Sequence, residues 1–225
     1  MFGIYTAPTS TFAKLREKPK WLVPLIIAAV ATMAAAAVAT QYVDWEEQRA
    51  TAVERMEERG MTEEQMDEAL ERMEAFSTNP VMRYGLPVLG ALVTYLVSMF
   101  FLSLVYNIAL PLVGTPGNYM KTLSVVTHAG LVAVPAALVR IVLMLLRGSA
   151  EVSTSLLLAF PDVGSRFLGV VLGRVDLFTI WQVILVGLGL KVVFDVKGSR
   201  SYWLAAAVWL LITLVFGALA LLGGR

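Results

Sequence analysis

The sequence predicts an all-α integral membrane protein: a helical bundle with five transmembrane helices, an N-terminal interfacial amphipathic helix and an acidic extramembrane helical hairpin. Composition is the first reason, because 58% of the 225 residues are hydrophobic and only 16% are charged, whereas a soluble domain carries about 25% charge. Patterning is the second reason, because most of the charges lie outside five long apolar runs. A helix is the structure that bonds every backbone group of such a run internally.

Each apolar run has close to the roughly 20 residues that a helix needs to cross bilayer hydrocarbon. The first run is rich in alanine, which permits close contact between helices in lipid. Pro135 lies in the middle of the third run and must leave one backbone carbonyl without its helical donor. We predict a single domain over residues 1–225, with crossings near 22–40, 85–110, 123–146, 177–194 and 202–222.

The segment before the first run alternates the apolar residues Phe12 and Leu15 with Lys14, Arg16 and Lys18. This pattern is typical of a short basic amphipathic helix that lies on an anionic inner leaflet, or that only fixes orientation. Basic residues also flank the loops that five crossings place on the same side as this segment. We therefore predict that the amino terminus lies in the cytoplasm and the carboxyl terminus outside.

Residues 41–79 form the one strongly polar stretch, with twelve acidic residues, four arginines and a net charge of −8. We expect a helical hairpin that is inserted between the first two crossings. Gly60 can end its first helix, Thr62 and Gln65 have the spacing of a capping box, and Asn79 precedes a proline that stops the second helix. The hairpin is either a partner-binding or cation-attracting head, or simply a solvated face.

The stretch 147–176 is longer than a tight connection needs. Its residues 152–160 are apolar but too few to cross a bilayer, so we expect an interfacial or re-entrant helix there. Residues 167–172 have the pattern of a further helical turn leading into the fourth crossing.

Ionisable groups within the crossings are costly, so each suggests a function. Arg140 lies near the outer end of the third crossing, Asp176 opens the fourth, and Gln182 lies nearly two turns further in. We expect an ion pair between Arg140 and Asp176.

On the inner side, four polar residues fall at comparable depths and are expected to line a vestibule: Asn107, His128, Lys191 and Asp195. These groups form either a polar path for an ion, a proton or a lipid headgroup, or only the bonds that hold helices together.

Composition also excludes several kinds of chemistry. The chain has no cysteine and one histidine, which leaves no disulfide, no thiolate metal site and no multi-histidine zinc site. The net charge of +1 and the lack of a basic stripe argue against nucleic acid as a partner. We therefore predict no catalytic, metal or cofactor residues. The expected partners are the lipid bilayer and, as a possibility left open, a membrane protein or a second copy of the chain.

Three stretches outside 41–79 have a characteristic order. They read PTSTF and KPKW within 8–21, GTPGNYMK and HAG within 114–130, and DLFTIW at 176–181. In this order they resemble the bacterial branch of the Yip1 domain family of five-pass membrane proteins. The resemblance implies a five-helix fold in the bacterial cytoplasmic (inner) membrane, with a cytoplasmic amino terminus. Eukaryotic relatives are associated with small GTPases and vesicle formation, a role that does not transfer to a bacterial chain.

Two functional hypotheses follow. The first is a non-enzymatic membrane organiser or partner-binding scaffold. The alternative is a small transporter or channel that moves an ion or lipid headgroup along a path lined by Arg140, Asp176, His128 and Asn107. An intramembrane enzyme is disfavoured because the sequence contains no HExxH, GxGD or GxSxG motif.

Overall fold

The computed structural model describes residues 3–160 and 163–222, and within these ranges it contains helices but no strand. Eleven α-helices follow one another along the chain: α1 Gly3–Thr6, α2 Pro8–Glu17, α3 Leu22–Ala39, α4 Trp45–Glu58, α5 Glu63–Thr78, α6 Leu86–Ala109, α7 Tyr119–Ala129, α8 Ala133–Arg147, α9 Arg166–Arg174, α10 Leu177–Phe194 and α11 Arg200–Leu222. Short turns of 3₁₀ helix (η1 Thr40–Tyr42, η3 Leu110–Val113, η4 Gly130–Val132 and η5 Leu156–Ala159) and one π-helical turn (η2 Val81–Gly85) extend or join them.

Five helical segments are long and apolar enough to cross a membrane, as the sequence predicts. Their outward side chains are large and apolar, which is expected where lipid is the solvent. The second and third spans are longer than their apolar runs indicate, because each helical segment continues into polar sequence. The segments are Leu22–Tyr42, Val81–Val113, Tyr119–Arg147, Leu177–Phe194 and Arg200–Leu221.

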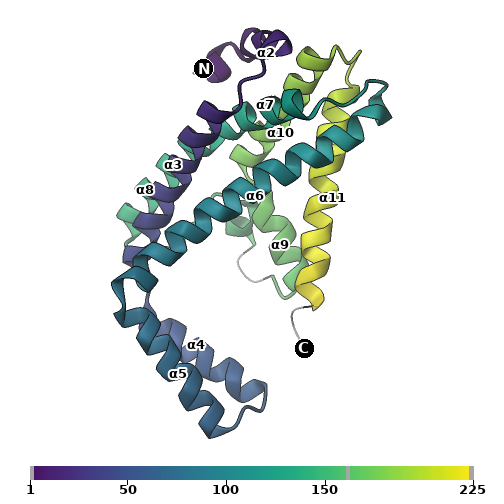
Figure 1. Ribbon diagram of the computed structural model, residues 1–225. Helices are drawn as coiled ribbons and strands as arrows, with labels where there is room; N and C mark the ends of the chain where they lie inside the picture. The colour runs from purple at the N-terminus through teal and green to yellow at the C-terminus, as the bar shows by residue number, and fades with distance from the viewer. Residues whose placement is uncertain (1–2, 161–162, 223–225) are drawn as a thin grey trace.

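The helices outside the spans lie at opposite ends of the bundle (Figure 1). Helix α3 packs between α6 and α8, while α11 packs against α9 and α10. Helices α1 and α2 lie at one end beside the 114–118 and 195–199 loops. The α4–α5 hairpin and the end of α11 lie towards the other. This grouping matches the sidedness of an odd number of crossings.

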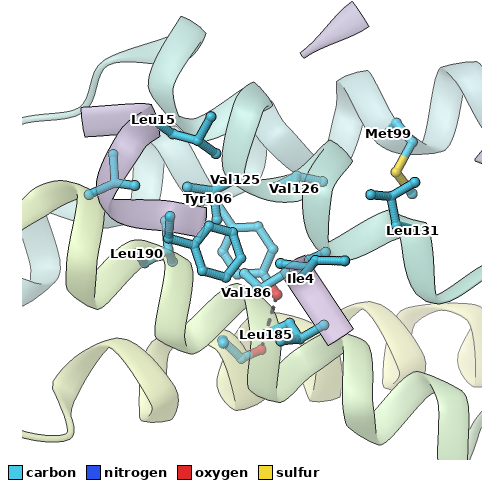
Figure 2. Close-up of a cluster of buried hydrophobic side chains, with 14 of the residues drawn as sticks. Ile4, Leu15, Met99, Tyr106, Val125, Val126, Leu131, Leu185, Val186 and Leu190 are labelled. Atoms are coloured by element: carbon cyan, nitrogen blue, oxygen red, sulfur yellow. Dashed lines mark hydrogen bonds between the residues drawn. The ribbon is translucent and has the colours of Figure 1, made fainter. Parts of the chain in front are cut away.

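The hydrophobic core lies in the half of the bundle nearest α1 and α2. Figure 2 shows Tyr106 of α6 among Ile4, Val186 and Leu185, which belong to α1 and α10. The Tyr106 hydroxyl donates to the carbonyl of Ala205 in α11 at 3.2 Å, so its polar atom is satisfied inside the core. Every span contributes to this cluster, which fills the bundle at this end.

The apolar side of α2 faces protein. Phe12 and Leu15 are buried, and α2 packs against α7 and α10. A Cβ at Gly189 would lie 2.9 Å from the Phe12 ring, so the absence of a side chain there makes room for it. At the exposed edge, Arg16 lies 3.6 Å from Asp195. That α2 also rests on an anionic leaflet stays a prediction.

Pro135 produces the predicted break in the third span. The backbone passes from α7 to α8 through the 3₁₀ turn at Gly130–Val132, because a proline at 135 has no N–H for the carbonyl of Leu131. Tyr5 of α1 replaces that donor: its hydroxyl lies 2.7 Å from the Leu131 oxygen. Burial raises the pKa of the Tyr5 phenol. Helix α1 is therefore hydrogen-bonded to the third span at the point where its helix is interrupted.

Changing Tyr5 to phenylalanine is expected to destabilise the protein by about 1 kcal/mol, the net value of one buried hydrogen bond. The effect is expected to shrink in a Pro135→Ala background, where the new N–H can bond to Leu131. Thermal unfolding of the four proteins of this cycle in detergent measures the coupling. An equal loss in both backgrounds would contradict the role assigned to Tyr5.

Residues 45–78 form two antiparallel helices joined at Gly60, whose φ of +67° ends α4. The predicted capping box is present: the Thr62 hydroxyl accepts from the Gln65 N–H, and the Gln65 side chain accepts from the Thr62 N–H. Asn79 then ends α5 and accepts from the N–H of Val81 at 2.9 Å, which starts the next helix.

The prediction of an interfacial or re-entrant helix over 152–160 is wrong for most of this segment. Only the single 3₁₀ turn Leu156–Ala159 forms, and Ser155 makes an isolated bridge with Asp176. The serines hold this backbone instead, because the Ser153 and Ser155 hydroxyls accept from nearby N–H groups. Residues 161 and 162 lie outside the described part of the chain. The further helical turn expected at 167–172 is present as α9, which packs against α11.

Candidate functional site

A polar cavity of about 540 Å³ opens between α3, α8 and α10, and we call it the α3–α8–α10 cavity. Three residues singled out in the sequence line it: Arg140 from α8, and Asp176 and Gln182 from α10. The space exists because the facing surfaces of α3 and α8 carry alanines, whose small side chains leave volume between helices that otherwise pack closely. Thr32 adds a hydroxyl on the α3 side.

The predicted ion pair between Arg140 and Asp176 does not form. Both residues lie within the described part of the chain, and no Arg140 nitrogen is within 4 Å of an Asp176 oxygen. Asp176 instead caps α10: one carboxylate oxygen accepts from the N–H groups of Phe178 and Thr179 at 2.8 and 3.0 Å, and the other from the Thr179 hydroxyl at 2.6 Å. An acidic residue in front of a helix is favoured by these orphan donors and by the helix dipole.

Replacing Asp176 by alanine is therefore expected to cost about 1 kcal/mol of stability, the usual value of a lost N-cap, while asparagine loses less. The cost is expected to be independent of Arg140. In a double-mutant cycle with Arg140→Ala, measured by thermal unfolding, we expect the two effects to add. A coupling energy well above the error of the cycle would show that Arg140 and Asp176 do interact.

Asp176 also reaches a second cavity. This space of about 320 Å³ lies between α6, α9, α10 and α11, and it shares Asp176, Thr179 and Gln182 with the first. Arg174 lines it, and its guanidinium carbon lies 4.4 Å from the centre of the Phe216 ring. The capped start of α10 thus separates two cavities, each with one arginine.

The four inner-side residues do not share one site. His128 is buried, with Nδ1 2.8 Å from the Ser124 carbonyl oxygen, and Asn107 lies against Gly117 of the following loop. Lys191 and Asp195 are exposed. The Lys191 amine lies 6.0 Å from the centre of the Tyr202 ring, and Asp195 faces Arg16 of α2. Each therefore has its own environment, and the predicted vestibule is not assembled.

The cavities and the inner-side residues are separated by the hydrophobic core. Val132 and Val186 belong both to the walls of the cavities and to the core cluster, where they pack with the side chains of α1 and α2. A polar path across the bundle would have to pass through this close-packed region. Within residues 3–160 and 163–222 the structure holds no group of three or more histidine, aspartate or glutamate side chains suited to a metal ion.

Several residues of the cavities have only weak sequence signals. Thr179 is three residues after an aspartate that opens an apolar run, which is the spacing of a cap and is visible in the sequence. Arg174 lies in α9, and nothing in its neighbourhood indicates a contact with Phe216, since that contact depends on how α9 packs on α11. Ser98 and Trp209 likewise join the second cavity only through helix packing.

The five long apolar helices within the described residues define a multi-pass helical membrane protein. The Yip1 domain model matches residues 2–219, and the chain belongs to that family. It is similar to the membrane protein YknW of Bacillus subtilis (strain 168), with 24% identity over 218 residues that cover 96% of this chain and 87% of that protein. No solved structure gives a significant match. The resemblance to this family predicted from the sequence is confirmed.

Proposed function

We propose that the chain is a non-enzymatic organiser or scaffold of the bacterial cytoplasmic membrane, with its amino terminus in the cytoplasm and the α4–α5 hairpin as its partner-binding element. The partner is a membrane protein or a second copy of the chain. The bundle anchors and orients this element, and the hairpin supplies the surface that a partner recognises.

One observation carries the proposal: the hairpin is well formed, yet none of the residues of α4 or α5 is buried. Both helices have side-chain caps, and they stand clear of the bundle in Figure 1. Ordering some thirty residues costs conformational entropy, and here little burial offsets it. A net charge of −8 over 41–79 suits a basic partner surface, because charge complementarity raises association rates and selects partners.

The transporter alternative rests on the α3–α8–α10 cavity, which offers Arg140, Asp176 and Gln182 to a polar solute. It is the weaker of the two, because His128 and Asn107 lie away from the cavity and the core fills the bundle between them. A path would require the core to open. Flux of a charged solute through reconstituted vesicles, lost in Arg140→Ala, would favour this alternative over the scaffold.

The scaffold is tested by removing hairpin charge without unfolding the hairpin. Six exposed acidic residues near the helix centres and carboxyl ends are changed to their amides, which takes the net charge from −8 to −2 and does not weaken the caps: Glu54, Glu57, Glu58, Asp67, Glu71 and Glu74. A control changes Glu17 and Glu151 to glutamine, outside the hairpin.

We expect crosslinking in native membranes to capture the same partner with wild type and control, and at least several-fold less of it with the hairpin variant. Thermal stability should be equal in all three proteins. An unchanged crosslinking pattern with the hairpin variant would contradict the proposal.

A further inference from the structure

We propose that a cavity at the neck of the hairpin binds the phosphate of an anionic glycerophospholipid. This site is independent of the partner-binding role. The hairpin-neck cavity measures about 620 Å³ and lies where the first two spans end and α4 and α5 begin. Its position at the ends of two membrane-spanning segments is the depth at which lipid headgroups lie.

The charged side chains that line the cavity are all cationic. Two arginines line it, Arg72 of α5 and Arg83 of η2, together with Trp45, Gln48 and Thr40. No carboxylate is among the lining residues, although the adjoining hairpin carries twelve acidic side chains. Arg72 is ion-paired at 3.4 Å with Glu68, which lies outside the wall, so Arg83 is the main cation that the site offers to a ligand. Guanidinium geometry matches phosphate oxygens, so the site favours a negative ligand. A zwitterionic headgroup would lack a partner for its amine.

Two of these donors lack partners within the chain. The indole Nε1 of Trp45 and the Nε of Arg83 are buried and have no hydrogen-bond partner in the described structure. A buried donor without an acceptor is costly, so such groups in a native protein call for an explanation. A phosphate bound in the cavity would supply acceptor oxygens to the Arg83 guanidinium.

Arg83 packs against two aromatic rings. Its guanidinium carbon lies 5.7 Å from the centre of the Trp45 ring and 5.2 Å from that of Tyr84, and Trp45 in turn contacts Phe76 at 5.8 Å. Cation–π contacts of this kind fix the cation and leave the edge of the guanidinium for a ligand. The arginine also lies in a π-helical turn, a local distortion that is common at functional sites.

The remaining walls suit the apolar part of a lipid. Ala36, Ala39, Val43 and Pro87 line the side facing the spans, and next to them Leu86 and Leu89 of α6 are about half exposed. Acyl chains that leave the cavity can run along this surface within the hydrocarbon, while the phosphate remains with the arginines. A free phosphate ion would use only the polar half of the site.

The test measures binding of dioctanoylphosphatidylglycerol to the full chain in detergent, by native mass spectrometry and thermal shift. Arg83→Gln and Arg72→Gln are the test variants, and Arg59→Gln is the matched control, since Arg59 is an exposed hairpin arginine outside the cavity wall. We expect about tenfold weaker binding in each test variant, the loss of one charge-assisted hydrogen bond, and unchanged binding in the control.

Two comparison ligands separate the sources of binding. Dioctanoylglycerol has the same chains without phosphate, and inorganic phosphate has no chains; both are expected to bind much more weakly than the phospholipid. Equal binding of dioctanoylglycerol, or equal affinity of both arginine variants and wild type for the phospholipid, would overturn the site. An equal thermal shift with inorganic phosphate would overturn its assignment to a lipid. If Arg83→Gln lowers stability without ligand, the affinity of Arg72→Gln, whose side chain is exposed, decides between these outcomes.

Discussion

Replacing Phe12 by alanine is expected to lower the stability of the protein by about 3 kcal/mol or more, the usual cost of truncating a fully buried phenylalanine. Phe12 belongs to α2, outside the spans, but its ring is fully buried in the core and rests against the backbone of Gly189 in α10. The change therefore opens a cavity at the point where the amino-terminal segment joins the helices of the bundle.

Thermal unfolding in detergent measures this loss, and Phe160→Ala is the matched control because that phenylalanine is 55% exposed. The control should unfold within about a degree or two of wild type. If Phe12→Ala were as stable as the control, α2 would not be part of the folded core, and it would be available to lie on the bilayer surface.

Replacing Gly187 by alanine is expected to have the second largest effect. A Cβ at this position would lie 2.6 Å from a ring carbon of Tyr202 and 3.0 Å from its Cα. The Cα belongs to the backbone of α11, so α10 and α11 must move apart. Overpacking of this kind costs about 1–3 kcal/mol, and it outweighs the gain of up to about 1 kcal/mol that alanine brings to a helix over glycine.

Gly90 of α6 provides the comparison, because nothing lies within 4 Å of a Cβ built there. Gly90→Ala should be neutral or slightly stabilising in the same thermal assay. A Gly187→Ala protein as stable as Gly90→Ala would show that α10 and α11 are not in close contact.

The spans could be predicted from sequence because bilayer thickness and backbone hydrogen bonding allow few alternatives to a long apolar helix. Their ends were less certain. The second span begins at Val81 and the third at Tyr119, so that Arg83 and Lys121 lie within helical rods although they are charged. Hydropathy reports where hydrocarbon ends, whereas hydrogen bonding and capping decide where a helix ends.

The contacts between the amino-terminal helices and the middle of the chain could not be predicted from the sequence. The alternation around Phe12 indicates an apolar face but not what covers it, and a core position and a lipid-facing position have the same residue preference in a membrane protein. Pro135 indicates that a carbonyl one turn earlier lacks its helical donor. The sequence around Pro135 does not indicate that the Tyr5 hydroxyl is the group that replaces this donor.

The candidate site was predicted in part. Arg140, Asp176 and Gln182 do line one cavity, and all three fall in the outer half of neighbouring spans. The predicted ion pair does not form because three donors at the start of α10 satisfy Asp176 locally. Local capping has no loop-closure cost, so it takes precedence where a carboxylate has both choices.

Thiol labelling tests most directly the central claim that five crossings hold the hairpin and the amino-terminal end on opposite sides of the membrane. The chain contains no cysteine, so each introduced cysteine is the only target of a membrane-impermeant reagent. Asp67 of α5 and Lys197 of the loop before α11 are both exposed. We expect Asp67→Cys to label on intact spheroplasts and Lys197→Cys to label only after permeabilisation. Labelling of both cysteines from the same side would contradict the five-span arrangement.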